Sequence, residues 1–353
     1  MPLNKLYLEL TDACNLNCEM CYRKTWRNMG SHMPSDLLNV ILDESTQTNS
    51  NASEYLNIQE IVLGGIGEPT IHPDFYDVLL RLKDKDITLT TNGTTIDDKM
   101  ADALVQSVKK IVVSVDGSQL VYDRIRGFEY NHLIKNLQKL NQAKEAKGKK
   151  TPVLTIQMVI SKENKNEILK VVEIAHQLGA SQLILSNLLP VTLEDKDSIL
   201  YTQFDNTEMI TFYKGIRNKA LRVGLEIKLT ESKLKTDRRC QFIEKNAMVI
   251  NSKGEVVPCY RFAHSGTEVV FGRLKQIEKV VFGCVGDKSL KELWDEKSYC
   301  IFREMVTKNQ YPSCPDCDLV DGCDFVRTTA GDCYGNTPTC ADCLWSRNIV
   351  YCV

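Results

Sequence analysis

Residues 5–21 have the sequence KLYLELTDACNLNCEMC, and this stretch carries the first indication of the fold. Lys5–Leu10 is rich in residues that favour β-structure and predicts a strand. Cys14, Cys18 and Cys21 follow it with the spacing C-x3-C-x2-C. Three thiolates leave a tetrahedral zinc site one ligand short, but they can hold three irons of a cubane [4Fe–4S] cluster and leave the fourth iron open. The alternative, a zinc loop completed by a distant ligand such as His32, is less favoured because the loop follows a strand directly.

Short β-rich runs then alternate with helical patterns as far as residue 222. Strands are expected at Lys5–Leu10, Glu60–Leu63, Ile87–Thr91, Ile111–Val115, Val153–Ile160 and Leu183–Ser186, and helices near 35–45, 73–84, 97–107, 130–146, 165–178 and 207–222. Six strand–helix units in a row predict an α/β fold with a parallel sheet and right-handed crossovers. A curved, barrel-like sheet and an open doubly wound sheet both fit this pattern. In either, ligands bind at the carboxyl ends of the strands.

The second predicted strand is followed by a glycine-rich turn, Gly64-Gly65-Ile66-Gly67-Glu68-Pro69. Glycines let the backbone approach a ligand closely. Alone, such a turn is equally typical of a tight connection between a strand and a helix. Its position at the same predicted sheet end as the cysteine loop indicates that the two form one site.

The 353-residue chain has 44 basic and 46 acidic side chains and a net charge of -2, and it is long enough for two domains. This balance argues against a protein that tracks nucleic-acid phosphates. No apolar run has the length of a membrane span, and the amino terminus lacks the features of a signal peptide. A cytoplasmic location is therefore expected, with neither nucleic acid nor membrane as a partner.

The 14 cysteines are unevenly distributed: three precede residue 22, none lies between 22 and 239, and eleven begin at Cys240. The polar stretch 229–239 marks the expected boundary between a domain at 1–230 and another at 231–353. In the second domain, residues 247–259 predict a hairpin turning at Ser252–Gly254, and residues 289–306 predict an amphipathic helix. The remainder is cysteine-rich loop with little apolar core, so bound metal is expected to organise it.

The motifs CNLNCEMC and GGIGEP resemble those of the radical S-adenosylmethionine (SAM) superfamily, over roughly residues 5–230. The resemblance implies a partial (β/α)6 TIM-like barrel. It also implies that SAM binds the open iron through its amine and carboxylate, and that an electron from the cluster cleaves SAM to methionine and a 5′-deoxyadenosyl radical. The backbone of Gly64, Gly65 and Gly67 would hold the amine, and Glu68 would belong to the same loop.

The same resemblance implies roles for two further residues. Ser114, at the end of the fourth strand, would contact the ribose of SAM. Arg126 would bind the SAM carboxylate, for which its guanidinium fork is suited. A surface ion pair is an equally plain interpretation of Arg126. The chain departs from the family at Met20, where an aromatic residue is usual; Met is apolar and adaptable enough to pack against adenine.

Eight of the later cysteines are enough for two four-coordinate clusters: Cys240, Cys259, Cys314, Cys317, Cys323, Cys333, Cys340 and Cys343. The alternative is a pair of structural zinc sites. Cys284, Cys300 and Cys352 remain and are expected to be buried or spare thiols.

Residues 240–343 resemble the SPASM domain, which holds auxiliary clusters in radical SAM maturases. The resemblance rests on G-x4-C at Gly254–Cys259 and C-x2-C-x5-C at Cys314–Cys323. It implies a nearer cluster on Cys240, Cys259 and Cys333, and a farther one on Cys314, Cys317 and Cys323 with Cys340 or Cys343. The chain departs from the family in that nine residues, not three, separate the Cys323–Cys333 pair.

The stretches CNLNCEMCYRKTW at 14–26 and NTPTCADCLWSRNIVYC at 336–352 further resemble the radical SAM maturases associated with tungsten-cofactor oxidoreductases. This implies a tungstopterin enzyme or its cofactor as the client, and a reducing partner such as ferredoxin or flavodoxin. Alternatives in the same class are a peptide-modifying enzyme of a ribosomal natural-product pathway and an anaerobic sulfatase maturase. Alternatives of other classes are a multi-cluster electron carrier and a zinc-stabilised binding module. No catalytic acid or base can be named; His72, after the glycine-rich turn, could line the site.

Overall fold

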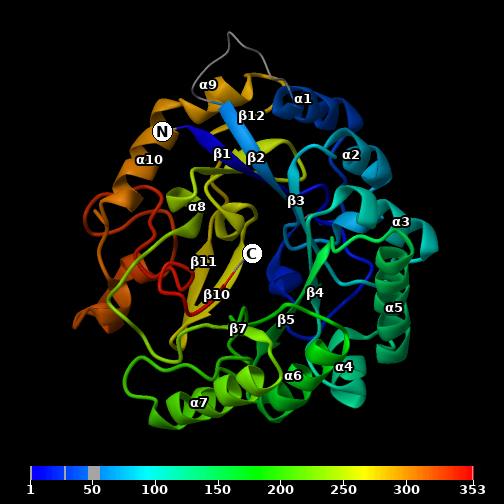
Figure 1. The fold of residues 1–353 in the computed structure, drawn as a ribbon. Helices are drawn as coiled ribbons and strands as arrows, with labels where there is room; N and C mark the ends of the chain where they lie inside the picture. Colours follow the sequence, from blue (N-terminus) through cyan, green and yellow to red (C-terminus); the bar gives the residue numbers. More distant parts are fainter. Residues whose placement is uncertain (1, 28, 47–55, 352) are drawn as a thin grey trace.

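The computed structural model describes residues 2–27, 29–46, 56–351 and 353, and a curved parallel sheet organises most of them (Figure 1). Seven strands follow one another across it in chain order: β1 (Leu3–Leu8), β2 (Leu56–Leu63), β3 (Asp86–Thr91), β4 (Lys110–Ser114), β5 (Val153–Ile160), β6 (Gln182–Asn187) and β7 (Glu226–Leu229). Every neighbouring pair among them is parallel. All six predicted strands are present, and β7 is an additional one.

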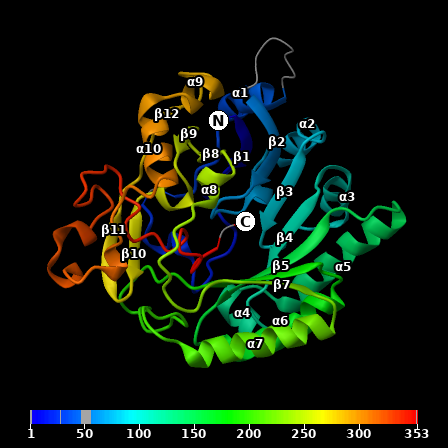
Figure 2. The same ribbon diagram turned by 60° about the vertical axis from the view of Figure 1, so that its left-hand side comes forward.

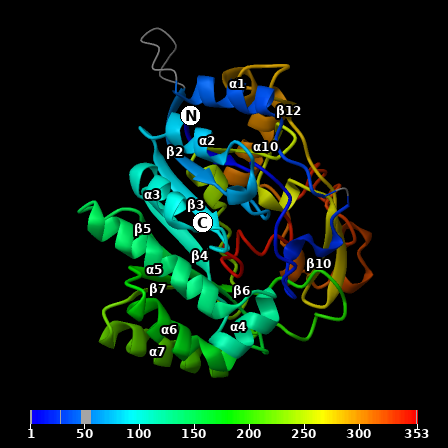
Figure 3. The same ribbon diagram turned by 90° about the vertical axis from the view of Figure 1, so that its right-hand side faces the viewer.

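Helices cover the outer face of this sheet (Figures 1 and 3). They are α1 (Ser35–Thr46), α2 (Phe75–Arg81), α3 (Asp98–Ser107), α4 (Gln119–Arg126), α5 (Tyr130–Ala146), α6 (Ile168–Gln177) and α7 (Thr207–Arg222). The six predicted helices are confirmed. Helix α4 is additional: it buries Tyr122 and Ile125 and ends at Gly127, whose φ of 65° favours glycine.

Alternating residues of β1 face the two sides of the sheet. Leu6 and Leu8 pack in the main apolar cluster with the outer helices, whereas Tyr7 packs inside the barrel with Val62 and Val249. This period of two is what a strand buried on both faces requires. The middle of the barrel interior is therefore apolar. The residues at the carboxyl ends of the strands form the mouth of the barrel.

The carboxyl-terminal third of the chain extends the same sheet. β8 (Ala247–Ile250) pairs in parallel with β1, β9 (Glu255–Val257) pairs antiparallel with β8, and β12 (Gly283–Cys284) pairs antiparallel with β9. The predicted hairpin is thus confirmed as β8–β9. The sheet order places β12 and β7 at its two ends, so the barrel stays open.

The remaining elements pack beside the open barrel. α8 (Gln241–Glu244) precedes β8, and β10 (Gly266–Val270) forms an antiparallel hairpin with β11 (Arg273–Ile277). The single helix expected at 289–306 is wrong: α9 (Leu290–Trp294) and α10 (Lys297–Thr307) are separate. Glu296 is extended between them, and this break lets Trp294 and Tyr299 both reach the core.

Short 3-10 turns and irregular segments complete the structure. The turns are η1 (Tyr22–Thr25), η2 (Pro69–Ile71), η3 (Lys165–Glu167), η4 (Tyr260–Phe262), η5 (Cys314–Asp316), η6 (Val320–Gly322) and η7 (Asp324–Val326). The last segment returns to the barrel mouth (Figure 2), where Asn187 Nδ2 donates to Ile349 O at 2.9 Å and Tyr351 N donates to Ser186 Oγ at 3.0 Å. In the described part of the chain, no helix is both long and apolar enough to cross a membrane.

Candidate functional site

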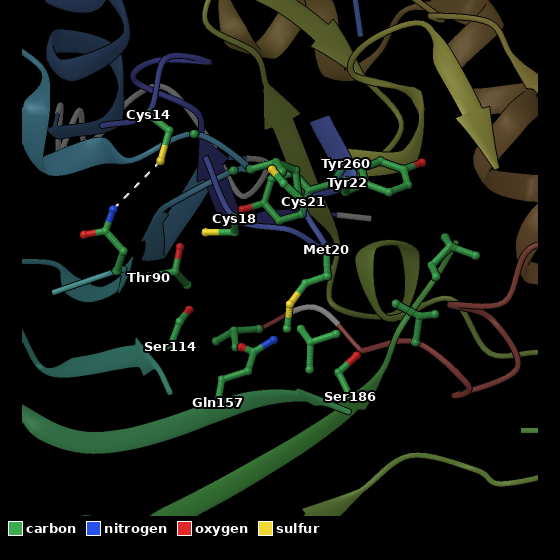
Figure 4. A pocket seen from close by; sticks show the side chains of 18 of the residues that line it. Cys14, Cys18, Met20, Cys21, Tyr22, Thr90, Ser114, Gln157, Ser186 and Tyr260 are labelled. Carbon is green, nitrogen blue, oxygen red and sulfur yellow. Dashed lines mark hydrogen bonds between the residues drawn. The ribbon is translucent and has the colours of Figure 1, made fainter. Parts of the chain in front are cut away.

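A cavity of about 250 Å³ lies at the carboxyl ends of the strands. Cys14, Cys18 and Cys21 line one side of it, and Ser114 and Gln157 lie across from them (Figure 4). The structure brings together the predicted residues of this site: Cys14, Cys18, Cys21, Gly65, Gly67, Glu68, Ser114 and Arg126 all line the cavity. Gly64 lies just behind the lining, where an added Cβ would collide with Thr90 Oγ1.

The cysteine loop, residues 11–21, is anchored by the Asp12 carboxylate. Its oxygens accept hydrogen bonds from Gly30 N at 2.6 Å, Ser31 N at 2.8 Å, Ser31 Oγ at 2.7 Å and Ser252 Oγ at 3.1 Å. Burial alone would raise the pKa of Asp12, but these hydrogen bonds outweigh it and lower the pKa. The first residues of the loop are therefore fixed by the nearby segment at Gly30 and Ser31 and by the distant residue Ser252.

The glycine turn, residues 64–69, interlocks with the cysteine loop. Glu68 N donates to Ala13 O at 2.8 Å, and a Cβ added to Gly67 would collide with the loop backbone at Thr11 and Ala13. Gly65 has a φ of 108°, which side chains rarely adopt. The two motifs are thus one rigid unit. The close approach of the cysteine loop at Gly67 and the positive φ of Gly65 explain why these two positions are glycine.

The Glu68 carboxylate is wholly engaged by the neighbouring loop. Oε1 accepts from Thr70 Oγ1 at 2.6 Å and Thr91 Oγ1 at 2.7 Å, and Oε2 accepts from Asn92 N at 2.7 Å. Burial raises the pKa of Glu68 in spite of these donors. Glu68 therefore links the turn after β2 to the turn after β3. Its carboxylate oxygens stabilise the wall of the cavity through these hydrogen bonds.

Arg126 forms a buried ion pair, in contrast to the surface pair that its sequence also allowed. Its Nε and Nη2 both bind Asp116 Oδ2, while Nη1 lies 3.7 Å from Cys18 Sγ. Burial opposes the charged guanidinium, but Asp116 and Cys18 outweigh it and raise the pKa of Arg126. Asp116 is itself fully buried and accepts from Val159 N at 2.7 Å. Arg126 is therefore a fixed cation facing the cysteine loop.

The three thiols suit a cluster with an open iron. Burial raises the pKa of Cys14 and of Cys18, and Arg126 opposes the rise at Cys18. Buried thiolates of this kind are stabilised by bound iron and by neighbouring cations. His32 packs edge-to-face on His72, with ring centroids 5.5 Å apart, and does not belong to the cavity lining. The interpretation of this loop as a zinc site completed by His32 is therefore not supported.

His72 does not line the cavity either. Its Nε2 bonds with Met33 O at 3.0 Å, and its Nδ1 accepts from Asp74 N at 3.1 Å. Burial lowers the pKa of His72, which favours the neutral ring. Through its two hydrogen bonds, His72 stabilises the loop after β2. Met20 does line the cavity, as expected (Figure 4).

Several residues that line the cavity are not among those predicted from the sequence. Gln157 and Ser186 were within reach, because they lie at or near the carboxyl ends of predicted strands. Trp345, Val350 and Tyr351 were not, because the segment that carries them has no regular structure and reaches the cavity from the far end of the chain.

The second cysteine group divides into two quartets. The inner quartet, Cys240, Cys259, Cys340 and Cys343, lines one buried cavity together with apolar side chains such as Phe242, Phe302 and Val306. Burial raises the pKa of Cys240 to about 12 and that of Cys259 well above its ordinary value. Four thiols around an apolar cavity fit the ligand set of an iron–sulfur cluster.

The outer quartet consists of Cys314, Cys317, Cys323 and Cys333. Burial, the Asp342 carboxylate and the nearby thiols of Cys323 and Cys333 together raise the pKa of Cys314 to about 12, which indicates that Cys323 and Cys333 lie near Cys314. Cys317 N donates to Cys314 O at 3.2 Å. Cys317 and Cys333 are exposed, so this quartet opens to the surface.

This grouping differs from the one expected from the sequence, which joined Cys333 to Cys240 and Cys259. The reason is the path of the chain. Cys314 N donates to Ala341 O at 3.1 Å, and residues 340–343 pass between the quartets with both of their cysteines on the inner side. Cys333 precedes this passage and stays on the outer side.

Two of the three remaining cysteines lie outside the quartets: Cys284 in β12 and Cys300 in α10, where Cys300 Sγ lies 3.2 Å from Arg303 Nη2. Cys352 lies outside the described residues. The 13 described cysteines are free of disulfides. Over the described ranges, no group of three or more His, Cys, Asp or Glu side chains is arranged to hold a single metal ion.

Comparison with known proteins agrees with this geometry. The radical SAM superfamily model matches residues 8–175, and an iron–sulfur cluster-binding domain, SPASM, matches residues 240–318. A tungsten-containing aldehyde ferredoxin oxidoreductase cofactor-modifying protein of Pyrococcus furiosus is 40% identical over 98% of this chain and 96% of its own.

Two solved structures have the same fold. The structure of anSMEcpe with bound AdoMet is 18% identical, with a TM-score of 0.63 over 98% of this chain and 93% of that one. Streptococcus suis SuiB bound to S-adenosylmethionine is 19% identical, with a TM-score of 0.60 over 95% and 73% of the two chains. On these matches and on the cysteine geometry, the chain belongs to the radical SAM superfamily of enzymes and carries a SPASM iron–sulfur domain.

Proposed function

We propose that this enzyme modifies the cofactor of a tungsten-containing oxidoreductase by radical chemistry. The activity rests on one observation: three thiols of a single loop, a rigid glycine turn and a fixed cation line the same cavity. The choice of client rests on the 40% identity, over nearly the whole length of both chains, to a protein named for that role.

Each part of the cavity has a distinct task in this proposal. Cys14, Cys18 and Cys21 hold a [4Fe–4S] cluster, and the turn at Gly65–Gly67 presents its backbone to the amine of SAM. When bound, the cluster and SAM supply an electron and a sulfonium whose cleavage yields the 5′-deoxyadenosyl radical. The chain supplies position, charge and exclusion of water.

Arg126 contributes a fixed positive charge. Because Asp116 occupies Nε and Nη2, only Nη1 is directed at the cysteine loop. A SAM carboxylate at the open iron would meet this nitrogen, and the buried Asp116 would keep the guanidinium from turning away. Ser114 lies across the cavity from the cysteines (Figure 4), and this position supports its proposed contact with the ribose.

The two quartets extend the site toward the surface. We assign one auxiliary [4Fe–4S] cluster to the inner quartet and one to the outer quartet. The exposure of Cys317 and Cys333 supports the proposal that a small reducing protein such as ferredoxin or flavodoxin contacts the outer quartet. We assign the SAM-binding barrel to residues 1–230 and the domain of the auxiliary clusters to residues 231–353.

The test begins with SAM cleavage. Anaerobically reconstituted protein, given SAM and dithionite, should form 5′-deoxyadenosine and methionine, measured by liquid chromatography and mass spectrometry. Cys18→Ala should abolish the product, and Cys300→Ala should leave it unchanged because Cys300 lies outside every cysteine group of the site. Product formation by Cys18→Ala would contradict the ligand assignment.

The client is tested separately. A tungsten oxidoreductase isolated from cells lacking this enzyme should show a mass change on its extracted cofactor after incubation with enzyme and SAM. A change on a short precursor peptide encoded beside the gene, with none on the cofactor, would replace this client by the peptide-modifying alternative.

A further inference from the structure

A chain of buried polar side chains runs between the cysteine groups of this enzyme. Tyr22 Oη donates to Glu268 Oε1 at 2.5 Å, and Arg261 Nε donates to Glu268 Oε2 at 2.9 Å. Arg261 Nη2 donates to Asp342 Oδ1 at 3.1 Å, and Lys275 Nζ lies 2.7 Å from Asp342 Oδ2. These five residues are called the ionic chain below.

The ionic chain passes all three cysteine groups. Tyr22 directly follows Cys21 and lines the main cavity. Arg261 lines the cavity of the inner quartet, and Asp342 lies between two of its cysteines in the sequence. Lys275 binds Asp342, and the preceding residue, Ala341, accepts a hydrogen bond through its carbonyl oxygen from Cys314 N of the outer quartet at 3.1 Å.

The stability of the folded protein does not explain why the charged side chains of the ionic chain are buried. Arg261, Glu268 and Lys275 are each 1% exposed and Asp342 is 3% exposed. Desolvating four charges is costly, and well-packed apolar side chains would commonly be at least as stable. Glu268 and Lys275 are register partners in the β10–β11 hairpin, so one hairpin directs an acid and a base to the same side. Figure 2 shows this hairpin beside the cysteine-rich coil.

Arg261, which lines the cavity of the inner quartet, has one guanidinium nitrogen that binds no carboxylate of the ionic chain. Arg261 Nε and Nη2 are bound to carboxylates, whereas Nη1 is buried and has no hydrogen-bond partner among the described residues. An unpaired buried guanidinium donor is expensive unless a ligand receives its hydrogen bond. The four thiols of the quartet line this cavity with Arg261, and apart from them only Tyr311 and Ser346 bring a hydroxyl group to its described lining.

We propose that Arg261 donates a hydrogen bond through Nη1 to the inner auxiliary cluster, and that Lys275 places a positive charge beside the outer one, so that these two side chains raise the reduction potentials of the two clusters. This inference rests on the proposed ligand sets of the two quartets. Arg261 and Lys275 are positioning residues that act on the clusters and not on the substrate.

The expected direction follows from charge. Reduction adds one negative charge to a cluster, and a nearby cation or hydrogen-bond donor stabilises that charge. Loss of the donor should lower the one-electron reduction constant at least tenfold, which is a fall of about 59 mV in midpoint potential. Each substitution should act on its own cluster and leave the other unchanged.

The experiment is an EPR-monitored redox titration of the full-length, anaerobically reconstituted enzyme. The signal of the inner cluster is identified as the one lost in Cys343→Ala, and that of the outer cluster as the one lost in Cys333→Ala. If both variants lose the same signal, the quartets themselves are wrong and the inference falls with them.

The inner cluster is tested with Arg261→Met combined with Glu268→Gln, which keeps the balance of buried charge. Arg261→Lys removes the Nη1 donor without removing the charge, and it tests the same hydrogen bond if the double variant loses iron. Lys275→Met tests the outer cluster. The control is Lys279→Met, which removes a cation that binds Glu255 at 2.6 Å and faces neither quartet.

We expect a lower reduction potential of the inner cluster in the Arg261 variants, a lower reduction potential of the outer cluster in Lys275→Met, and no change of either in Lys279→Met. Unchanged potentials in Arg261→Lys and Lys275→Met, with iron content equal to the unmodified enzyme, would overturn it. An equal fall of both potentials in all variants, the control included, would also overturn it, because a general loosening would then be the cause.

Discussion

Substituting Gly67 by Ala tests whether the glycine turn and the cysteine loop form one unit. The new Cβ would lie 2.7 Å from Ala13 O and closer still to Thr11 O, whereas ordinary contact begins at 3.4 Å. The backbone of the cysteine loop must therefore retreat by about 0.7 Å or more. Overpacking of this kind costs about 1–3 kcal/mol, and a shift near 1 Å in a reacting group lowers the rate by about 100-fold.

The assay is 5′-deoxyadenosine formation together with iron content and urea unfolding. Gly67→Ala should lose most of its SAM cleavage and about 1–3 kcal/mol of unfolding free energy. The matched control is Gly215→Ala in α7, where a Cβ meets nothing within 4 Å and helix propensity should add about 0.5–1 kcal/mol. Wild-type activity and stability in Gly67→Ala would refute the interlocking.

Further substitutions test the role of Arg126, the two cysteine quartets and the Asp12 carboxylate. Arg126→Met leaves the buried Asp116 unpaired, so it should cost about 3–5 kcal/mol in urea unfolding and weaken SAM binding in calorimetry; unchanged binding would contradict the role of Nη1. Cys333→Ala and Cys343→Ala should each lose about four irons, and the double variant about eight; a double variant that loses no more than the single ones would contradict the two quartets. Asp12→Asn should cost about 1.5–3 kcal/mol at pH 7. Because the folded state lowers the pKa of Asp12 below its ordinary 3.8, this stabilisation is present above that pH and is lost as pH falls through the folded value, so the two proteins should converge in acid; a difference that persists there would contradict the ionic origin.

The parallel sheet and the first cysteine site could be predicted because their information is local. Apolar runs at Ile111–Val115 and Val153–Ile160 are long enough to define strands, and the spacing of Cys14, Cys18 and Cys21 limits what they can bind. The parallel order of the strands then brings their carboxyl ends to one rim. Ser114, the last residue of β4, reaches the cavity for that reason.

The cysteine quartets and the helix break could not be predicted, because they depend on contacts between distant segments. Residues 310–343 have almost no regular structure, so nothing in their spacing shows that Ala341 pairs with Cys314. The break at Glu296 follows from the burial of Trp294 and Tyr299 in one core, which no helical period reveals. Asp116, the partner of Arg126, was visible only as the end of a strand.

The parallel pairing of β8 with β1 affects how the chain must be made. Leu3–Leu8 leaves the ribosome well before Ala247–Ile250, the strand that pairs with one of its two hydrogen-bonding edges. Until those residues are synthesised, the nascent protein therefore exposes an unprotected strand edge, a template for wrong pairing between chains. Synthesis of Ala247–Ile250 closes that edge, so termination before these residues should favour aggregates over a shorter native fold.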